Sequence, residues 1–326
     1  MKTKKLLTLV LALTLIVSLF SFASCSGKKQ YVIGISQLVT HDALDAATQG
    51  FKDAVIAGLG EENVEFDFQN ADNSTDACAT IANSFVNKKV DLIMANATPA
   101  LNAAYNATET IPILGTSITE YGVALNIKDF NGTVGGNVSG TSDLAPLDRQ
   151  AQMILDLIPD AKKVGLLYCS GEPNSDYQVK VVRKYLEDKG ITCTDYTFSG
   201  SDDVSTIAAK AAADNDAIYI PTDNTAASCA ETIYGAMAEK KPIIAGESGI
   251  CSGCGIATLS IDYYDLGYAT GEMAVKILKG EADISTMAIE YTPEEKLAKK
   301  YNKTICKELG IDTAKLEAEG YTALGE

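Results

Sequence analysis

Short apolar runs that end at polar residues recur along this chain. Residues 217–225, AIYIPTDNT, place an apolar segment directly before a proline and four polar side chains. Residues 91–99, DLIMANATP, have the same order of apolar and polar positions. Such a run is typical of a buried parallel strand, and polar groups at its carboxyl end are typical of a ligand crevice.

Two further pairs of segments recur in the same order, with an offset of about 130 positions: YVIGIS with KKVGLLY, and IPILGTS with KPIIAGES. This order predicts two lobes of one design, although two unrelated sheets with ordinary strand patterns would also explain it. Apolar strands alternate with segments of helical periodicity. The pattern therefore predicts an α/β protein made of two Rossmann-like lobes with parallel sheets.

The elements after residue 255 do not fit two successive lobes. They predict a strand, a long helix ending at Gly280 and a strand over 284–291. If these elements cross between the lobes, the two lobes are connected by three strands that form a hinge. The expected division is 1–24 as a signal peptide, 25–30 as a tether, 31–141 plus 262–283 as the first lobe, and 142–261 plus 284–326 as the second. Residues 135–143, GGNVSGTSD, are expected to form a bending segment between the lobes.

The N-terminus has the layout of a secretory signal peptide. Lys2, Lys4 and Lys5 precede an apolar run over 6–20, which is short for a membrane span. Residues 22–26, FASCS, resemble a bacterial lipobox, in which Cys25 is lipidated and becomes the mature N-terminus. The alternative is an ordinary signal peptide with an incidental cysteine. We expect an extracytoplasmic protein anchored to the membrane through lipid on Cys25.

Composition and motifs exclude several functions. A net charge of −16 repels phosphate backbones, so nucleic acid is not an expected partner. The chain has one histidine and lacks a P-loop, a GxGxxG after the first strand, HExxH and GxSxG. We therefore expect that the protein is not an enzyme and that it binds no cofactor and no metal ion. Cys251 and Cys254 form a CxxC whose thiols are either free or joined in a local disulfide.

Polar residues gather at the predicted strand ends and helix starts. Free backbone N–H groups at helix starts favour a carboxylate, so a ring of such residues can hold a small zwitterion. Each residue has an alternative role as a helix cap. Asp223 is the expected partner of a ligand ammonium, because it follows an apolar strand. The candidate ligand-binding residues are Gln37, His41, Asn96, Thr98, Ser117, Thr119, Asn174, Ser175, Asp223, Asn224, Glu247 and Asp262.

Several segments, in order along the mature chain, resemble the substrate-binding lipoproteins of ABC importers of the tryptophan/tyrosine type. They include HDALDAATQGF, DLIMANATPA, GGNVSGTSD, GEPNSDYQ, PTDNTAAS and IDYYDLGYATGEMAVKILKG. The resemblance implies the type I periplasmic-binding fold and a ligand between the lobes. It also implies ligand contacts for Gln37, Thr98, Asn174, Ser175, Asp223, Asn224 and Asp262.

The expected function is that of a monomeric binding protein that closes on a small solute, such as an aromatic amino acid, and delivers it to an ABC permease. Tyr121, Tyr177, Tyr263 and Tyr264 lie near the predicted cleft loops and are expected either to pack on a ligand ring or to serve ordinary packing. A sensory binding protein of the same fold, presenting its ligand to a membrane receptor, is the alternative function.

Overall fold

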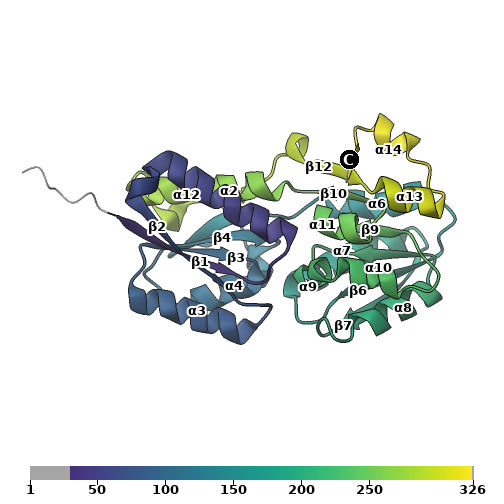
Figure 1. Ribbon diagram of the computed structural model, residues 1–326, viewed down its shortest axis with the longest axis horizontal. Helices are drawn as coiled ribbons and strands as arrows, with labels where there is room; N and C mark the ends of the chain where they lie inside the picture. The colour runs from purple at the N-terminus through teal and green to yellow at the C-terminus, as the bar shows by residue number, and fades with distance from the viewer. Residues whose placement is uncertain (1–29, 325–326) are drawn as a thin grey trace, which may run out of the picture.

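The computed structural model describes residues 30–324. These residues form two α/β lobes that lie side by side (Figure 1). The predicted signal peptide, Cys25 and most of the predicted tether lie outside the described residues.

The first lobe is built on a six-stranded sheet with the order β11-β5-β4-β3-β1-β2, in which every neighbouring pair is parallel. Its strands are β1 (Tyr31–Gln37), β2 (Val64–Asn70), β3 (Leu92–Asn96), β4 (Ile113–Ile118), β5 (Val138–Ser142) and β11 (Glu290–Tyr291). Its helices are α2 (Asp42–Leu59), α3 (Thr75–Lys88), α4 (Thr98–Ala107), α5 (Tyr121–Ala124) and α12 (Tyr263–Leu278), with short 3₁₀ turns at Glu61–Asn63 and Ile284–Thr286.

The second lobe contains a seven-stranded sheet with the order β13-β12-β10-β9-β8-β6-β7, in which β12 runs antiparallel to β10. Its strands are β6 (Lys163–Cys169), β7 (Thr192–Phe198), β8 (Ala217–Ile220), β9 (Ile243–Ala245), β10 (Ala257–Ser260), β12 (Ala298–Tyr301) and β13 (Thr322–Ala323). Its helices are α6 (Leu147–Leu157), α7 (Pro173–Asp188), α8 (Val204–Asp214), α9 (Asn224–Ser228), α10 (Ala230–Ala236), α11 (Ser248–Gly253), α13 (Lys303–Leu309) and α14 (Ala314–Ala318).

The chain crosses between the two sheets three times: from β5 to α6, from β10 to α12, and from β11 to β12, with a 3₁₀ turn at Glu294–Lys296 in the last connection. We expected residues from 284 onward to belong to the second lobe. This boundary is wrong, because β11 pairs in parallel with β5 of the first sheet. The expected strand over 284–291 is likewise reduced to Glu290–Tyr291, after a 3₁₀ turn.

Helices α2 and α12 pack together on one face of the first sheet (Figure 1), although more than 200 residues separate their first positions. Glycines allow this close approach. A Cβ on Gly267 would lie 1.9 Å from the carbonyl oxygen of Ala47, and one on Gly50 would lie 2.1 Å from the carbonyl oxygen of Tyr264. Phe51, Val55 and Met273 are buried beneath the helix pair against the sheet. Part of the core of the first lobe therefore depends on a helix that follows most of the second lobe in sequence.

Candidate functional site

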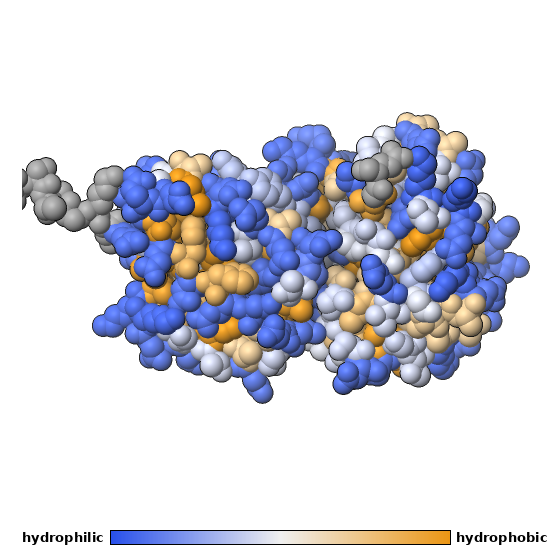
Figure 2. Space-filling model, viewed as in Figure 1, coloured by the Kyte–Doolittle hydropathy of each residue, from blue (hydrophilic) through white to orange (hydrophobic). Residues whose placement is uncertain are grey.

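The two lobes touch through residues at the carboxyl ends of their strands. His41 Nε2 lies 3.4 Å from Asn224 Oδ1, and Asn73 donates through Nδ2 to Thr225 Oγ1 at 3.1 Å. Hydrophilic side chains predominate on the face shown in Figure 2, where the lobes meet near the middle of the molecule. The structure is thus a closed arrangement in which the strand ends of the two lobes face each other.

A series of hydrogen bonds and electrostatic interactions connects polar residues where the two lobes meet. Asp143 accepts a hydrogen bond from Tyr263, whose hydroxyl also lies near Thr222. Asn174 donates to the Thr222 carbonyl oxygen and to Glu172. The series continues through Asn224 and His41 to Glu247, which interacts electrostatically with Asp143. We call this set the interlobe site, and its members are His41, Asp143, Glu172, Asn174, Thr222, Asn224, Glu247 and Tyr263.

Two grooves flank the interlobe site. One, of about 450 Å³, is lined by His41 and Asp42 of the first lobe and by Glu231 and Gly249 of the second. The other, of about 350 Å³, is lined by Glu247, Asp262 and Tyr263. Both volumes are in the range of small-molecule sites.

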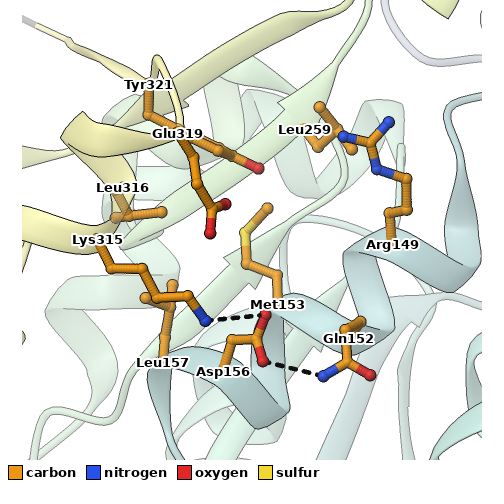
Figure 3. A pocket seen from close by; sticks show the side chains of 10 residues that line it. All are labelled: Arg149, Gln152, Met153, Asp156, Leu157, Leu259, Lys315, Leu316, Glu319 and Tyr321. Atoms are coloured by element: carbon orange, nitrogen blue, oxygen red, sulfur yellow. Dashed lines mark hydrogen bonds and ion pairs between the residues drawn. The ribbon is translucent and has the colours of Figure 1, made fainter.

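Figure 3 shows a smaller pocket, of about 120 Å³, elsewhere in the second lobe. Side chains of α6 and of the C-terminal segment around α14 line it, and Lys315 pairs with Asp156 at 3.2 Å. This pocket contains none of the predicted ligand-binding residues.

Three predicted carboxylates cap helices. Asp223 Oδ1 accepts from the backbone N–H of Ala226 at 2.7 Å, and its Oδ2 accepts from the backbone N–H of Cys169 and from Ser175 Oγ. Glu247 accepts the backbone N–H groups of Gly249 and Ile250. Asp262 is exposed and caps α12.

The expectation that Asp223 turns its carboxylate toward the cleft stays a prediction, and its contacts within the second lobe are those of a helix cap. Three donors inside the second lobe occupy both of its oxygens, which is the capping alternative. Burial and the neighbouring carboxylate of Glu172 raise the pKa of Asp223 above its ordinary value. An aspartate directly after a strand can satisfy a helix N-terminus instead of a ligand, and the sequence pattern is the same in both cases.

Two other predicted residues also form contacts within their own lobe. Gln37 accepts from Thr48 and donates to Asp45, both at 2.6 Å, which fixes the loop between β1 and α2. Asn96 donates to the carbonyl oxygen of Leu44. Both are fully buried, so they support the cleft loops from beneath.

Other predicted residues have buried polar atoms without a hydrogen-bond partner. Among residues 30–324, these atoms include Ser117 Oγ, Asn174 Oδ1 and His41 Nδ1, and Asn96 Oδ1 also lacks a partner. Such atoms cost free energy in a folded protein unless a ligand or water satisfies them. Thr98 and Thr119 are buried beside the same strand ends.

The backbone at these strand ends adopts unusual conformations. Ala97, between β3 and α4, has φ 88° and ψ 156°, a region that residues with a Cβ rarely adopt. Ser117, near the end of β4, has φ 55°. Helix α4 follows Ala97 without a side-chain cap. Conformations of this kind persist only where the surrounding structure holds them in place, and in proteins they cluster at ligand sites.

The sequence pattern missed two buried acids. Asp143 follows β5 and is 2% exposed. Its Oδ2 accepts from Tyr263 at 2.9 Å, whereas its Oδ1 has no hydrogen-bond partner within residues 30–324. Burial raises the pKa of Asp143 to about 6, although hydrogen bonds from Tyr263 and Thr119 lower it in part. Its position directly after a strand of small and polar residues was the signal that could have identified it.

Glu172 is the second missed acid. It is 4% exposed and accepts five hydrogen bonds, from Asn174 Nδ2, from the backbone and side chain of Asn224, and from the backbone and side chain of Thr225. Asn224 and Thr225 also make two polar contacts to the first lobe. Glu172 therefore fixes the part of the second lobe that touches its neighbour.

Comparison with known proteins places these features in a family. Residues 32–316 match the family of ABC transporter substrate binding proteins. A tyrosine-binding protein of Clostridioides difficile strain R20291 is 38% identical over 309 residues, which cover 89% of each chain. The chain belongs to this family. As a member of it, the substrate-binding protein binds a solute and is not an enzyme.

Two solved structures resemble the substrate-binding protein to different degrees. A structure from Streptococcus pneumoniae in complex with L-Trp is 32% identical, covers 91% of this chain and 100% of that one, and has a TM-score of 0.85. The ligand-free, open structure of an adhesive substrate binding protein from Clostridium difficile is 36% identical, covers 90% and 100%, and has a TM-score of 0.68. The predicted type I periplasmic-binding fold is confirmed. The present arrangement is closer to the complex than to the open form.

The described part of the substrate-binding protein contains no helix that is long and apolar enough to cross a membrane. Its seven cysteines between residues 30 and 324, Cys251 and Cys254 among them, are free thiols. Burial raises the pKa of Cys251 well above its ordinary value.

Proposed function

We propose that this protein captures an aromatic amino acid between its lobes and delivers it to the permease of an ABC importer. The observation that carries the proposal is the set of buried, unpaired polar atoms between two lobes that are already in contact. A ligand with both donors and acceptors would satisfy these atoms and would stabilise the closed arrangement over the open one.

The first lobe offers a place for the ligand carboxylate. Asn96 and Thr116 are neighbours across β3 and β4, and Ala97 donates its N–H to the Thr116 carbonyl oxygen. The uncapped start of α4 and the unpaired Ser117 hydroxyl therefore lie on adjacent strand ends. Backbone N–H groups at a helix start together with a hydroxyl are suitable donors for a carboxylate.

Two of the four expected tyrosines have positions that suit a ligand ring. Tyr263 is part of the interlobe site, and Tyr177, on α7, is half-buried and close to Glu120 of the first lobe. Tyr121 is instead buried in the first lobe, with hydrogen bonds to Gly115 and Thr141, and Tyr264 is bound to Asp53 on α2. The names of the relatives, a tyrosine-binding protein and a structure in complex with L-Trp, support an aromatic side chain.

Calorimetric titration tests the proposal. The protein is first unfolded in denaturant and refolded by dialysis, so that any copurified ligand is removed. We expect L-tyrosine, L-tryptophan or L-phenylalanine to bind with one-to-one stoichiometry, and L-leucine and L-glutamate to bind at least tenfold more weakly. If none of the three aromatic amino acids binds at millimolar concentration, the proposed ligand class is wrong.

We further propose that Cys25, outside the described residues, carries a lipid that holds the monomeric protein at the outer face of the cytoplasmic membrane. The lipobox-like residues 22–26 after a short apolar run support this anchor. The Cys25→Ala variant is expected to move from the membrane fraction to the soluble fraction or the medium. A variant that stays with the membrane would place the anchor elsewhere.

A further inference from the structure

We infer that Asp143 is the counter-charge for the ammonium group of the bound ligand, so that the site selects a primary amine. The inference rests on the proposed function and adds to it a recognition residue on the first crossing between the lobes. It derives from a comparison of the four buried acids around the interlobe site: Asp143, Glu172, Asp223 and Glu247.

Three of these acids already use both of their carboxylate oxygens. Glu172 accepts five hydrogen bonds, Asp223 accepts three, and each oxygen of Glu247 accepts a backbone N–H. Their donors belong to the second lobe and fix the starts of α9 and α11. The hydrogen bonds of these three carboxylates therefore stabilise the second lobe.

Asp143 differs from them in geometry. The Tyr263 hydroxyl donates to Oδ2 at 2.9 Å, and the Thr119 side chain is a second neighbour that lowers the pKa of this carboxyl. Within residues 30–324, Oδ1 is buried and makes no hydrogen bond. Asp143 also lies between the lobes, because β5 ends at Ser142 in the first sheet and α6 begins at Leu147 in the second lobe.

Closure without a ligand therefore has a cost at this position. A buried carboxylate with an unpaired oxygen loses the water that would solvate it in an open cleft. A ligand ammonium beside Oδ1 would supply both a donor and an opposite charge. The ligand ammonium would therefore neutralise the Asp143 carboxylate when the lobes close. A ligand with an amine would favour closure, and a ligand without one would not.

The test compares L-tyrosine with 3-(4-hydroxyphenyl)propionate, which lacks only the amine. Affinities are measured by calorimetry for wild type, Asp143→Asn and the matched control Asp148→Asn, which removes an exposed acid on α6. In wild type we expect L-tyrosine to bind at least 100-fold more tightly than the amine-free analogue. In Asp143→Asn, L-tyrosine should lose about 100-fold to 3,000-fold in affinity, because a buried charge pair has lost one partner.

The amine-free analogue should bind Asp143→Asn as well as it binds wild type, or better, since it needs no counter-charge. Asp148→Asn should match wild type with both probes. The inference is overturned if folded Asp143→Asn binds L-tyrosine within threefold of wild type. If Asp143→Asn does not fold, the comparison of the two probes on wild type is the test. Equal affinity of wild type for L-tyrosine and for the amine-free analogue would exclude a counter-charge for the ammonium group. Failure of wild type to bind any aromatic amino acid would instead overturn the proposed function, and this inference with it.

Discussion

Replacement of Glu172 by alanine is expected to lower the free energy of unfolding by about 3 kcal/mol. In wild type the backbone N–H groups of Asn224 and Thr225 donate to the Glu172 carboxylate. In the alanine variant these buried N–H groups have no acceptor. Each such donor costs about 1–3 kcal/mol. The loss is partly offset, because the neighbouring Asp223 no longer faces a second buried carboxylate.

The Gln variant separates hydrogen bonding from charge. Glu172→Gln keeps one acceptor oxygen but turns an NH₂ group toward donors, so we expect a loss of about 1–2 kcal/mol. Both variants should also weaken ligand binding, since Asn224 and Thr225 carry the contacts to the first lobe. Glu187→Ala, an exposed position on α7, the helix that begins after Glu172, is the control and should stay within about 0.5 kcal/mol of wild type.

Urea unfolding followed by circular dichroism gives these values, provided that a single transition with an unchanged slope is observed. If Glu172→Ala unfolds within about 0.5 kcal/mol of wild type, the five hydrogen bonds do not stabilise the start of α9, and the reasoning is refuted.

Three other predictions concern charge, packing and closure. Burial and the neighbouring Glu172 raise the folded-state pKa of Asp223. The stability of wild type relative to Asp223→Asn should therefore fall as the pH rises above the ordinary aspartate pKa of about 4, and a pH-independent difference in urea unfolding would contradict this. Gly267→Ala should cost at least about 1–3 kcal/mol, because its Cβ would meet the Ala47 carbonyl oxygen, whereas Gly235→Ala, with open space around it, should be neutral or slightly stabilising in the same assay. Saturating L-tyrosine should reduce the radius of gyration in X-ray scattering, and an unchanged radius would argue against lobe closure.

The sequence was sufficient to predict most of the parallel strands and the order of the two lobes, because buried parallel strands leave a strong apolar pattern, but not β12 and β13. The end of the first lobe was misplaced, since a two-residue strand such as β11 has no such pattern. Its place in the first sheet depends on pairing with β5, which is distant in sequence.

The candidate site was harder to predict than the fold. Asp223 and Asp143 both follow strands, yet one carboxylate accepts from Ala226 of α9 and from Cys169 at the end of β6, and the other has an unpaired oxygen. This difference depends on which donors the fold brings within 3 Å, and those donors come from other segments of the chain. For Asp143 the donor is Tyr263, 120 residues away.

The packing of α12 on α2 has a consequence for the order in which the chain folds. During synthesis or export the strands from β1 to β5 emerge first, but Met273 and Ala274 of α12, which complete the core on one face of that sheet, follow most of the second lobe. Until α12 arrives, apolar surface around Phe51 and Val55 is exposed to chaperones and to other nascent chains. The first lobe is therefore completed only after most of the second lobe has been made, and its long-range contacts are expected to make folding slow.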